Sequence, residues 1–235
     1  MTLTRYGFRE WFGGGIIALV LIGAGVFLCR YEAVQWLGWT LIGIAAVAWC
    51  CLAAFFRNPH RNIPTDEDVM VSPADGVIKD IEVLENCEFS EFKDQRVLRI
   101  GIFLSVLNVH VNRAPCAMTV SSKHYREGRY LDARSPQCSK ENEAMTIVGS
   151  GTVGKHVFPV AVRQISGAIA RRIVCPVEPG RQMIKGELYG MIKFGSRTEL
   201  YLPENIGMKI CVNIGEAVSA GSTILCRLRD DNETV

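Results

Sequence analysis

The sequence carries one ten-residue pattern twice, first as Val177-Glu178-Pro179-Gly180-Arg181-Gln182-Met183-Ile184-Lys185-Gly186 and again as Val212-Asn213-Ile214-Gly215-Glu216-Ala217-Val218-Ser219-Ala220-Gly221. Both copies read V-x-x-G-x-x-[MV]-x-x-G, and the second begins 35 positions after the first. Glycines at such fixed offsets indicate tight turns, because glycine adopts positive φ at little steric cost. Two copies are too few for a solenoid, so the pattern predicts a pair of matched turns within one domain.

The segments around this repeat favour a mainly β domain with few short helices. Short β-branched runs alternate with Gly, Pro and Asn turns, which is typical of strands. Helix is expected only at 105–111 and in part of 125–142. With its paired turns, the domain resembles the lipoyl-like, barrel-sandwich folds. The predicted strands are 69–72, 77–83, 97–104, 116–121, 146–153, 157–165, 172–177, 188–194 and 198–202.

Two uncharged runs precede this domain, at about 11–29 and 33–56. Each is long enough to cross about 30 Å of hydrocarbon as a helix. Residues 1–62 are therefore predicted to form a membrane-anchoring helical hairpin, and residues 63–235 the β domain. A cleaved signal peptide fits poorly, because a second apolar run follows at once. A re-entrant hairpin that dips into the bilayer without crossing it remains an alternative.

Arginines flank the two apolar runs unevenly. Arg5 and Arg9 precede the first run, Arg57 and Arg61 follow the second, and Arg30 lies between them. The positive-inside rule therefore places both ends of the hairpin, and the domain after it, on the cytoplasmic side of the cell (inner) membrane.

Composition argues against several classes of function. The formal net charge is only +2, which gives no electrostatic case for binding nucleic acid. None of the nine cysteines belongs to a C-x-x-C pair, and no His or Cys cluster has zinc-site spacing. We therefore expect no metal site, and a reducing compartment rather than a disulfide framework.

A Gly-Ser pair separates two of the predicted strands, within Met191-Ile192-Lys193-Phe194-Gly195-Ser196-Arg197. Its ordinary interpretation is a tight turn, and by spacing alone the turn is favoured. In the alternative interpretation Ser196 attacks the carbonyl carbon of Gly195. Glycine has no side chain to obstruct that approach, and it tolerates strained backbone.

Two more polar residues lie in turns next to strands. Asp75 belongs to Ser72-Pro73-Ala74-Asp75-Gly76, where an Asp usually caps the turn. His110 belongs to Asn108-Val109-His110-Val111-Asn112-Arg113-Ala114-Pro115, where a lone His is more often structural. Together with Ser196 they supply the acid, base and nucleophile of triad chemistry, although sequence alone does not show that they meet.

Six short blocks occur in order along the chain, and together they resemble the short-form phosphatidylserine decarboxylase proenzymes from about residue 55 to residue 226. Two of the blocks have ordinary explanations when taken alone: Glu141-Asn142-Glu143 as an exposed turn and Arg171-Arg172 as a solvated strand end. The blocks are Phe56-Arg57-Asn58-Pro59, Ser72–Gly76, Asn108–Pro115, Glu141–Glu143, Ile169-Ala170-Arg171-Arg172-Ile173 and Phe194–Arg197.

This resemblance implies a zymogen that makes its own cofactor. The Gly195-Ser196 bond would undergo autocatalytic cleavage by an N→O acyl shift and β-elimination, leaving chains 1–195 and 196–235. Ser196 would become a pyruvoyl group, and the family's Asp and His base system maps onto Asp75 and His110. The pyruvoyl ketone would form a Schiff base with the amine of phosphatidylserine. Loss of the carboxylate would then give phosphatidylethanolamine, a lyase reaction of phospholipid biosynthesis at the membrane.

One departure from the family concerns the histidine block. Long-form members carry two histidines three positions apart, and here the second position is Arg113. His110 would then serve both as base and as proton donor, or another group is recruited. By residue type, Arg113, Arg171 and Arg172 are candidates to hold the lipid phosphate. The short family also includes decarboxylases of archaeal ether lipids, so an archaetidylserine substrate stays open, as does a homo-oligomer.

Three other functions compete with the decarboxylase. A membrane-fusion adaptor also joins a membrane segment to a lipoyl-like barrel, but it needs a coiled-coil hairpin, and no sustained heptad appears. A lipoyl or biotinyl carrier needs its modified lysine in a tight hairpin, which Lys193 matches poorly. A zinc peptidase needs paired His and Asp ligands, which the His110 block lacks. The ordered blocks favour the decarboxylase over all three.

Overall fold

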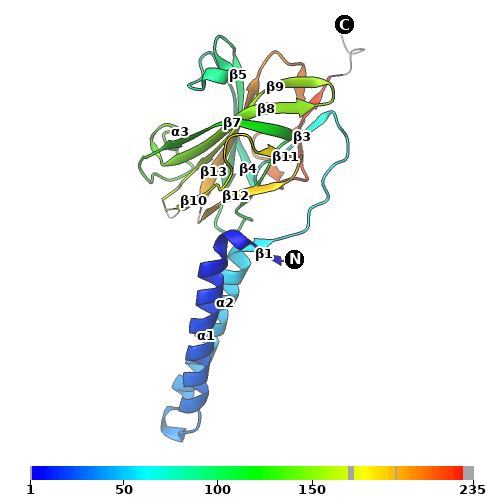
Figure 1. Cartoon of the computed structure of the whole chain (residues 1–235). Helices are drawn as coiled ribbons and strands as arrows, with labels where there is room; N and C mark the ends of the chain where they lie inside the picture. The colour runs from blue at the N-terminus through cyan, green and yellow to red at the C-terminus, as the bar shows by residue number, and fades with distance from the viewer. Residues whose placement is uncertain (1, 169–171, 194, 230–235) are drawn as a thin grey trace. The chain divides into compact units, whose positions relative to one another are not determined.

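The computed structural model describes residues 2–168, 172–193 and 195–229, and Figure 1 shows its helices and strands. The chain separates into two compact units, Met1–His60 and Arg61–Val235. The first unit is built from two long helices, and the second is built mainly from strands. The predicted fold class, an apolar helical hairpin followed by a mainly β domain, is confirmed.

The N-terminal unit is a hairpin of helices α1 (Phe8–Leu28) and α2 (Gln35–Phe55). Both helices are long and apolar enough to cross a membrane, since at 1.5 Å per residue each spans about 30 Å. Shorter elements flank them: η1 (Arg5–Gly7), η2 (Glu32–Val34), β1 (Thr2–Leu3) and β2 (Arg57–Asn58). The two short strands pair with each other and close the open end of the hairpin.

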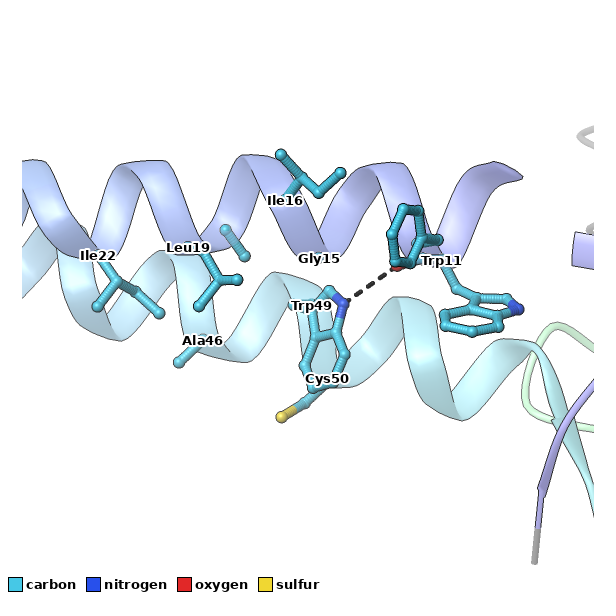
Figure 2. Close-up of a pocket in the computed structure, with 10 residues that line it drawn as sticks. Trp11, Gly15, Ile16, Leu19, Ile22, Ala46, Trp49 and Cys50 are labelled. Carbon is cyan, nitrogen blue, oxygen red and sulfur yellow. Dashed lines mark hydrogen bonds between the residues drawn. The ribbon is translucent and has the colours of Figure 1, made fainter. Parts of the chain in front are cut away.

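Small residues allow the two helices to pack closely. A Cβ added to Gly25 would lie 2.8 Å from the carbonyl oxygen of Gly38, so a larger residue there would push the helices apart. Near the other end of the hairpin, Trp49 Nε1 donates to the backbone oxygen of Trp11 at 3.2 Å (Figure 2). An apolar groove of about 520 Å³ runs between the helices beside this contact.

The second unit is made of antiparallel strands in three sheets. The largest sheet has the order β11-β7-β8-β9-β13-β5-β4-β15, and the smaller ones are β10-β12-β6 and β14-β16-β3. Two short helical segments accompany them, η3 (Ser90–Phe92) and α3 (Cys138–Glu141). The strands are β3 (Val69–Val71), β4 (Gly76–Leu84), β5 (Val97–Leu104), β6 (Val111–Arg113), β7 (Ala117–Arg126), β8 (Ala144–Val153), β9 (His156–Ile165), β10 (Arg172–Val174), β11 (Gln182–Met183), β12 (Leu188–Lys193), β13 (Ser196–Pro203), β14 (Met208–Ile210), β15 (Ala217–Val218) and β16 (Ile224–Leu228).

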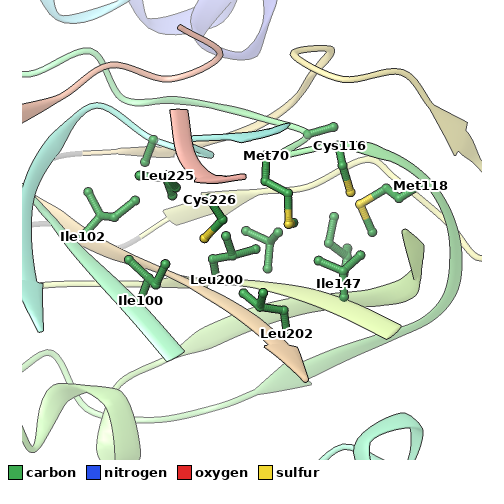
Figure 3. Packing of buried hydrophobic residues seen from close by; sticks show 14 of the residues in the cluster. Met70, Ile100, Ile102, Cys116, Met118, Ile147, Leu200, Leu202, Leu225 and Cys226 are labelled. Atoms are coloured by element: carbon green, nitrogen blue, oxygen red, sulfur yellow. The ribbon is translucent and has the colours of Figure 1, made fainter. Parts of the chain in front are cut away.

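The main core lies on one face of the large sheet. Figure 3 shows side chains from several strands meeting there, among them Ile100, Leu200 and Cys226. Successive residues of a strand point to opposite faces, so Tyr201, next to Leu200, belongs instead to a second, smaller cluster that includes Phe89. The central strand β13 is therefore buried on both faces.

Both copies of the repeat form the matched turns that the sequence predicts. The first copy pairs with residues 114–120 and the second with residues 72–78, through corresponding backbone hydrogen bonds. The φ angles agree closely between copies: 88° and 91° at Gly180 and Gly215, and 78° and 76° at Gly186 and Gly221. The repeat thus brings two distant segments, one containing Asp75 and the other directly following His110, into equivalent positions.

One helix prediction was wrong. Residues 105–111 form a turn that leads into β6, not a helix. The side chain of Asn108 accepts hydrogen bonds from the amide and the hydroxyl of Ser105, at 2.8 and 2.7 Å. Such side-chain bonds compete with helical hydrogen bonding. In the second expected region, 125–142, the helix is limited to α3 at Cys138–Glu141.

Candidate active site

The Gly195-Ser196 bond lies where the chain leaves β12 and enters β13. Ser196 is the first residue of β13 and pairs with Leu104 of β5. Gly195 has φ of 65°, in the left-handed region that favours glycine. Ser196 is fully buried, and among the described residues its Oγ has no hydrogen-bond partner. A buried hydroxyl without a partner costs free energy, and such groups point to a function.

The carbonyl of Gly195 is packed against Gly167. A Cβ placed on Gly167 would overlap the Gly195 carbonyl oxygen, so only glycine leaves room for that oxygen in its present position. On the other side, the nearest atom to a Cβ added at Gly195 would be a methyl carbon of Val106, 3.8 Å away. The Gly195 carbonyl is thus closely packed, while the space beside the Gly195 α-carbon is open.

His110 contacts the same peptide segment from the β6 side. Its Nε2 accepts a hydrogen bond from the backbone N–H of Gly195 at 3.1 Å, and its Nδ1 lies 2.9 Å from the backbone oxygen of Asn108. Both contacts are satisfied by one tautomer, in which the proton is on Nδ1 and Nε2 is unprotonated. The buried imidazole therefore presents its basic nitrogen next to the Gly195-Ser196 bond.

The described hydrogen bonds of Asp75 join it to Arg61 and Ala220. Arg61 Nη2 donates to Oδ2 and Oδ1 of Asp75 at 2.6 and 2.8 Å, and the Ala220 amide donates to Oδ1 at 2.8 Å. Among the described contacts none joins Asp75 directly to His110. Their segments are nevertheless adjacent, because the Arg113 amide donates to the Pro73 oxygen at 3.0 Å. The structure thus brings Ser196 and His110 to one place, with Asp75 in the neighbouring turn.

A buried amide network lies on the same face of β13 as Ser196. Asn112 Nδ2 donates to Thr198 Oγ1 at 3.1 Å, and Gln164 Nε2 donates to Asn112 Oδ1 at 2.9 Å. All three residues are fully buried. Because Thr198 is two residues from Ser196, this network fixes the strand next to the Gly195-Ser196 bond.

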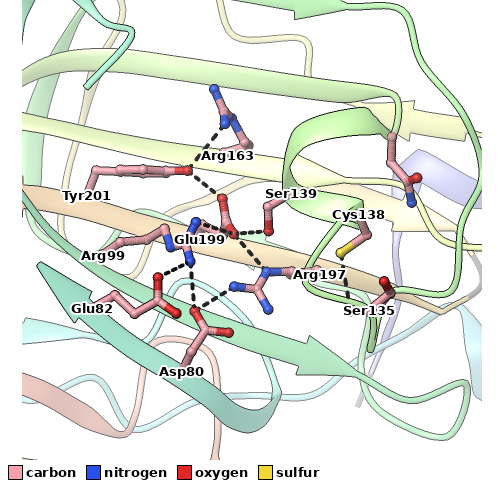
Figure 4. Close-up of polar contacts among 12 residues, drawn as sticks. Asp80, Glu82, Arg99, Ser135, Cys138, Ser139, Arg163, Arg197, Glu199 and Tyr201 are labelled. Atoms are coloured by element: carbon pink, nitrogen blue, oxygen red, sulfur yellow. Dashed lines mark hydrogen bonds and ion pairs between the residues drawn. The ribbon is translucent and has the colours of Figure 1, made fainter. Parts of the chain in front are cut away.

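The opposite face of β13 carries a buried ionic network (Figure 4). Arg197 donates to Asp80 and to Glu199, both at 2.7 Å, and Glu199 also accepts from Ser139 at 2.6 Å. Tyr201 donates to Glu199 as well. Burial alone would raise the pKa of the Glu199 carboxyl, but the Arg197 charge and the hydrogen bonds outweigh burial and hold that pKa below its usual value.

The Glu141-Asn142-Glu143 block contains a buried residue, Asn142, that joins two segments of the chain. Its side chain is fully buried, accepts from the Leu131 amide, and donates to the Leu131 and Ser166 backbone oxygens, all at 2.8 Å. These bonds tie the segment after Leu131 to the segment that contains Gly167. Glu141 is exposed, as an exposed turn would require, but the buried Asn142 holds together two segments that border the site.

A cavity of about 340 Å³ borders the segment that contains Gly195. Gly195 forms part of its lining, so the cavity gives a small molecule access to the Gly195-Ser196 bond. The remaining lining comes from three segments: Phe103 to Val106 at the end of β5, Asp132 to Arg134, and Ala168.

The three arginines predicted to hold phosphate have different surroundings. Arg113 is half-buried and donates from Nη1 to the Gly186 oxygen at 2.9 Å. Burial, and then the nearby charge of Arg61, lower the pKa of its guanidinium. Arg172 is exposed at the start of β10, opposite Lys193. Arg171 lies outside the described residues.

Several residues of the site were missed by reasoning from the sequence. Gln164 and Thr198 looked like ordinary strand residues, and Gly167, which follows the predicted strand 157–165, was not singled out. Arg61 was considered only for its effect on membrane topology. The available signal was weak: a Gln near the end of β9 and a Gly two residues after that strand both mark positions that packing alone does not explain.

Comparisons with known proteins identify the family of the chain. A family model described as phosphatidylserine decarboxylase matches residues 50–226. A phosphatidylserine decarboxylase proenzyme from Cereibacter sphaeroides is 40% identical over 209 residues, covering 89% of this chain and 86% of the relative. Another from Paramagnetospirillum magneticum is 38% identical over 233 residues, covering 97% and 91%. A third, from a Wolbachia of Brugia malayi, is 43% identical over 179 residues, covering 76% of each chain. The chain belongs to the phosphatidylserine decarboxylase family.

Proposed function

We propose that this chain cleaves its own Gly195-Ser196 bond and then decarboxylates phosphatidylserine to phosphatidylethanolamine. The observation that carries the proposal is the Ser196 hydroxyl, which is buried, has no partner among the described residues, and follows a left-handed glycine whose N–H contacts His110. A serine in an ordinary turn would hydrogen-bond its own backbone or water.

Cleavage begins when the Ser196 Oγ attacks the Gly195 carbonyl carbon. His110 Nε2, released from its hydrogen bond with the Gly195 N–H, takes the hydroxyl proton and passes it to the Ser196 nitrogen, and the Gly195–Ser196 C–N bond breaks as the ester forms. Elimination across Cα–Cβ of residue 196 then expels the Gly195 carboxylate, and hydrolysis with water releases ammonia and leaves a pyruvoyl group. The products are chains 1–195 and 196–235.

Asp75 supports this chemistry from the neighbouring turn. Its carboxylate is held at two points, by Arg61 and by the Ala220 amide, and so fixes the Ser72–Gly76 turn against the segment that follows His110. We assign Asp75 and His110 together as the base system of self-cleavage, with His110 as the residue at the bond.

The pyruvoyl group at residue 196 supplies an electron sink for the pair of electrons left when the carboxylate departs. The chain's own residues position the substrate and move the proton. Gly195 and the cavity beside it leave access to residue 196. Because Arg113 occupies the position of a second histidine, His110 also returns the proton to the substrate carbon.

The hairpin holds the catalytic unit at the membrane that contains its substrate. Two apolar helices are consistent with membrane association. The arginine distribution favours both ends of the hairpin in the cytoplasm. Reporter fusions after Arg5 and after Val235 should both give cytoplasmic signals, and a signal from the opposite side at either position would overturn this topology.

The two chains are expected to stay together after cleavage. Strand β13 begins at the new end of the small chain and pairs along its length with β5, and over five positions with β9. Separating the chains would break these backbone ladders and expose a strand buried on both faces. The mature protein is therefore a complex of its own two chains that acts on a membrane phospholipid.

Intact-mass measurement of the purified, denatured protein tests the proposal. The wild type should give a 1–195 chain and a 196–235 chain. The 196–235 chain should be lighter, by the mass of one ammonia molecule, than the same peptide with an N-terminal serine. Borohydride reduction in the presence of phosphatidylserine should attach the lipid covalently to the small chain. An active preparation that contains only the intact 26.0 kDa chain would exclude self-cleavage.

Two serine variants give a matched comparison. Ser196→Ala removes the nucleophile and should leave one uncut, inactive chain. Ser166→Ala removes another buried hydroxyl that has no partner among the described residues, and it should still be cleaved. Cleavage of the Ser196→Ala variant at the same bond would place the nucleophile elsewhere.

A further inference from the structure

The cavity beside Gly195 is lined by only two charged side chains, Asp132 and Arg134, among the described residues. Both come from the segment between β7 and α3. At about 340 Å³ the cavity lies near the lower end of small-molecule sites, which is a suitable size for a lipid head group. This cavity also opens toward the position where the reaction must take place, because Gly195 is part of its wall.

Arg134 is held in a defined orientation with one edge unused. Its Nε donates to both carboxylate oxygens of Asp132 at 3.1 Å, and its Nη2 donates to Oδ2 at 2.6 Å. Nη1 makes no hydrogen bond within the described part of the chain. The side chain is 68% exposed, so this free edge remains open to a ligand.

The segment that carries Arg134 is anchored at both ends. Asn142 binds both backbone groups of Leu131, and Ser139 donates to the buried Glu199 of β13. Between these anchors, Cys138 Sγ contacts the Ala133 oxygen at 3.4 Å. A guanidinium on a segment fixed in this way is preorganised for binding.

We propose that Arg134 binds the phosphodiester of the substrate head group in this cavity, with Asp132 as the residue that orients it. This inference rests on the proposed decarboxylase function. A guanidinium edge matches phosphate oxygens, and Arg134 adds to Arg113, whose Nη1 is already bonded to the Gly186 oxygen.

Arg134 is better suited to bind the phosphate of the substrate than to bind its carboxylate. The carboxylate loses its negative charge as it becomes carbon dioxide, so a cation bound to it would stabilise the ground state more than the transition state. The phosphodiester keeps its charge throughout the reaction. Binding it lowers KM without opposing the chemical step.

The test compares Arg134→Gln with Arg129→Gln in the full chain, assayed with phosphatidylserine in mixed micelles. Arg129 lies in the same segment, is exposed, and pairs with Glu141 away from the cavity lining. Intact mass should show complete cleavage in both variants. Arg134→Gln should raise KM about 10- to 100-fold with kcat nearly unchanged, the loss of a charge-assisted hydrogen bond. Arg129→Gln should match the wild type.

A second measurement separates phosphate from carboxylate recognition. Glycerophosphoethanolamine carries the phosphodiester but no carboxylate, and it should inhibit the wild type more strongly than Arg134→Gln. Equal inhibition of both, with KM for phosphatidylserine raised, would assign Arg134 to the carboxylate and overturn the proposal. An unchanged KM in fully cleaved Arg134→Gln would also overturn it. If the wild type itself neither cleaves nor decarboxylates, the proposed function fails instead.

Discussion

Strand β13 has two buried faces that differ in chemistry. On one face, Ser196 and Thr198 lead into the apolar core through Leu200. On the other, Arg197 and Glu199 form an ionic network. The strand alternates between them residue by residue, so Ser196, the proposed nucleophile, and a buried ion pair are direct neighbours in the sequence.

The two faces suit different roles: one positions the bond that is proposed to be cleaved, and the other holds the strand in place. The core face holds the bond that we propose is cleaved and few charges, and the Ser196 hydroxyl there has no competing partner within the described residues. The ionic face ties Arg197 to Asp80 of β4 and Glu199, through Ser139, to α3. We infer that the ionic face holds the new chain end in place once the peptide bond has gone.

Glu199→Gln is expected to have the largest effect among the variants that test these separate roles of the two faces. Removing the charge leaves Arg197 buried with one fewer anionic partner, and breaking a buried ion pair costs about 3–5 kcal/mol. Hydrogen exchange of the 196–203 amides, measured in the uncut Ser196→Ala background, should report this loss. The control is Glu204→Gln, whose partially exposed pair with Arg96 should contribute about 0–1 kcal/mol. Equal opening free energies in the two variants would contradict the role of the ionic face.

The pH dependence of the same exchange follows from the lowered pKa of Glu199. A carboxyl whose folded pKa lies below its unfolded value of about 4.3 stabilises the fold fully above that value. The stabilisation is lost as pH falls through the lower folded pKa. The 196–203 amides should therefore open more readily below about pH 4, with a weaker dependence in Glu199→Gln. An identical acid profile in both proteins would assign the transition to other carboxyls.

Thr198→Val tests the core face. The substitution keeps the shape but leaves the buried Asn112 amide without this acceptor, at a cost of about 1–3 kcal/mol. Because Thr198 is two residues from the scissile bond, cleavage should also slow by about tenfold, which is equivalent to about 1.4 kcal/mol in the barrier. Time-resolved intact mass measures the rate, and Thr198→Ser, which retains the hydroxyl, should cleave normally. Normal cleavage in Thr198→Val would show that the network is not needed to position the bond.

The fold was readable from the sequence because its signals are local. Two apolar runs and an exact spacing of glycines predict the hairpin and the paired turns without knowledge of any long-range contact. Residues 105–111 were misread because the Ser105–Asn108 side-chain bonds that favour a turn are visible only in three dimensions.

The site was only partly readable for a related physical reason. Ser196, His110 and Asp75 stand out by residue type and by their turns. Arg134, Gln164 and Asn142 act through partners 11 to 52 positions away or through a cavity. Long-range pairing of this kind depends on strand register, which a single sequence specifies only weakly.

Tyr201→Phe is expected to have the smallest effect of these variants, and it tests whether the two faces of β13 act independently. The tyrosine hydroxyl donates to Glu199 and accepts from Arg163 at 3.3 Å, and its ring lies in the small cluster with Phe89. Phenylalanine keeps the ring packing and removes one hydroxyl, so the 196–203 amides should lose about 1 kcal/mol of protection. The cleavage rate should not change, because the hydroxyl lies on the ionic face and Glu199 keeps its bonds to Arg197 and Ser139. Intact-mass kinetics and hydrogen exchange on the same protein samples separate the two effects. If cleavage slows as much in Tyr201→Phe as in Thr198→Val, the two faces are coupled through the strand, and reaction and retention cannot be assigned to them separately.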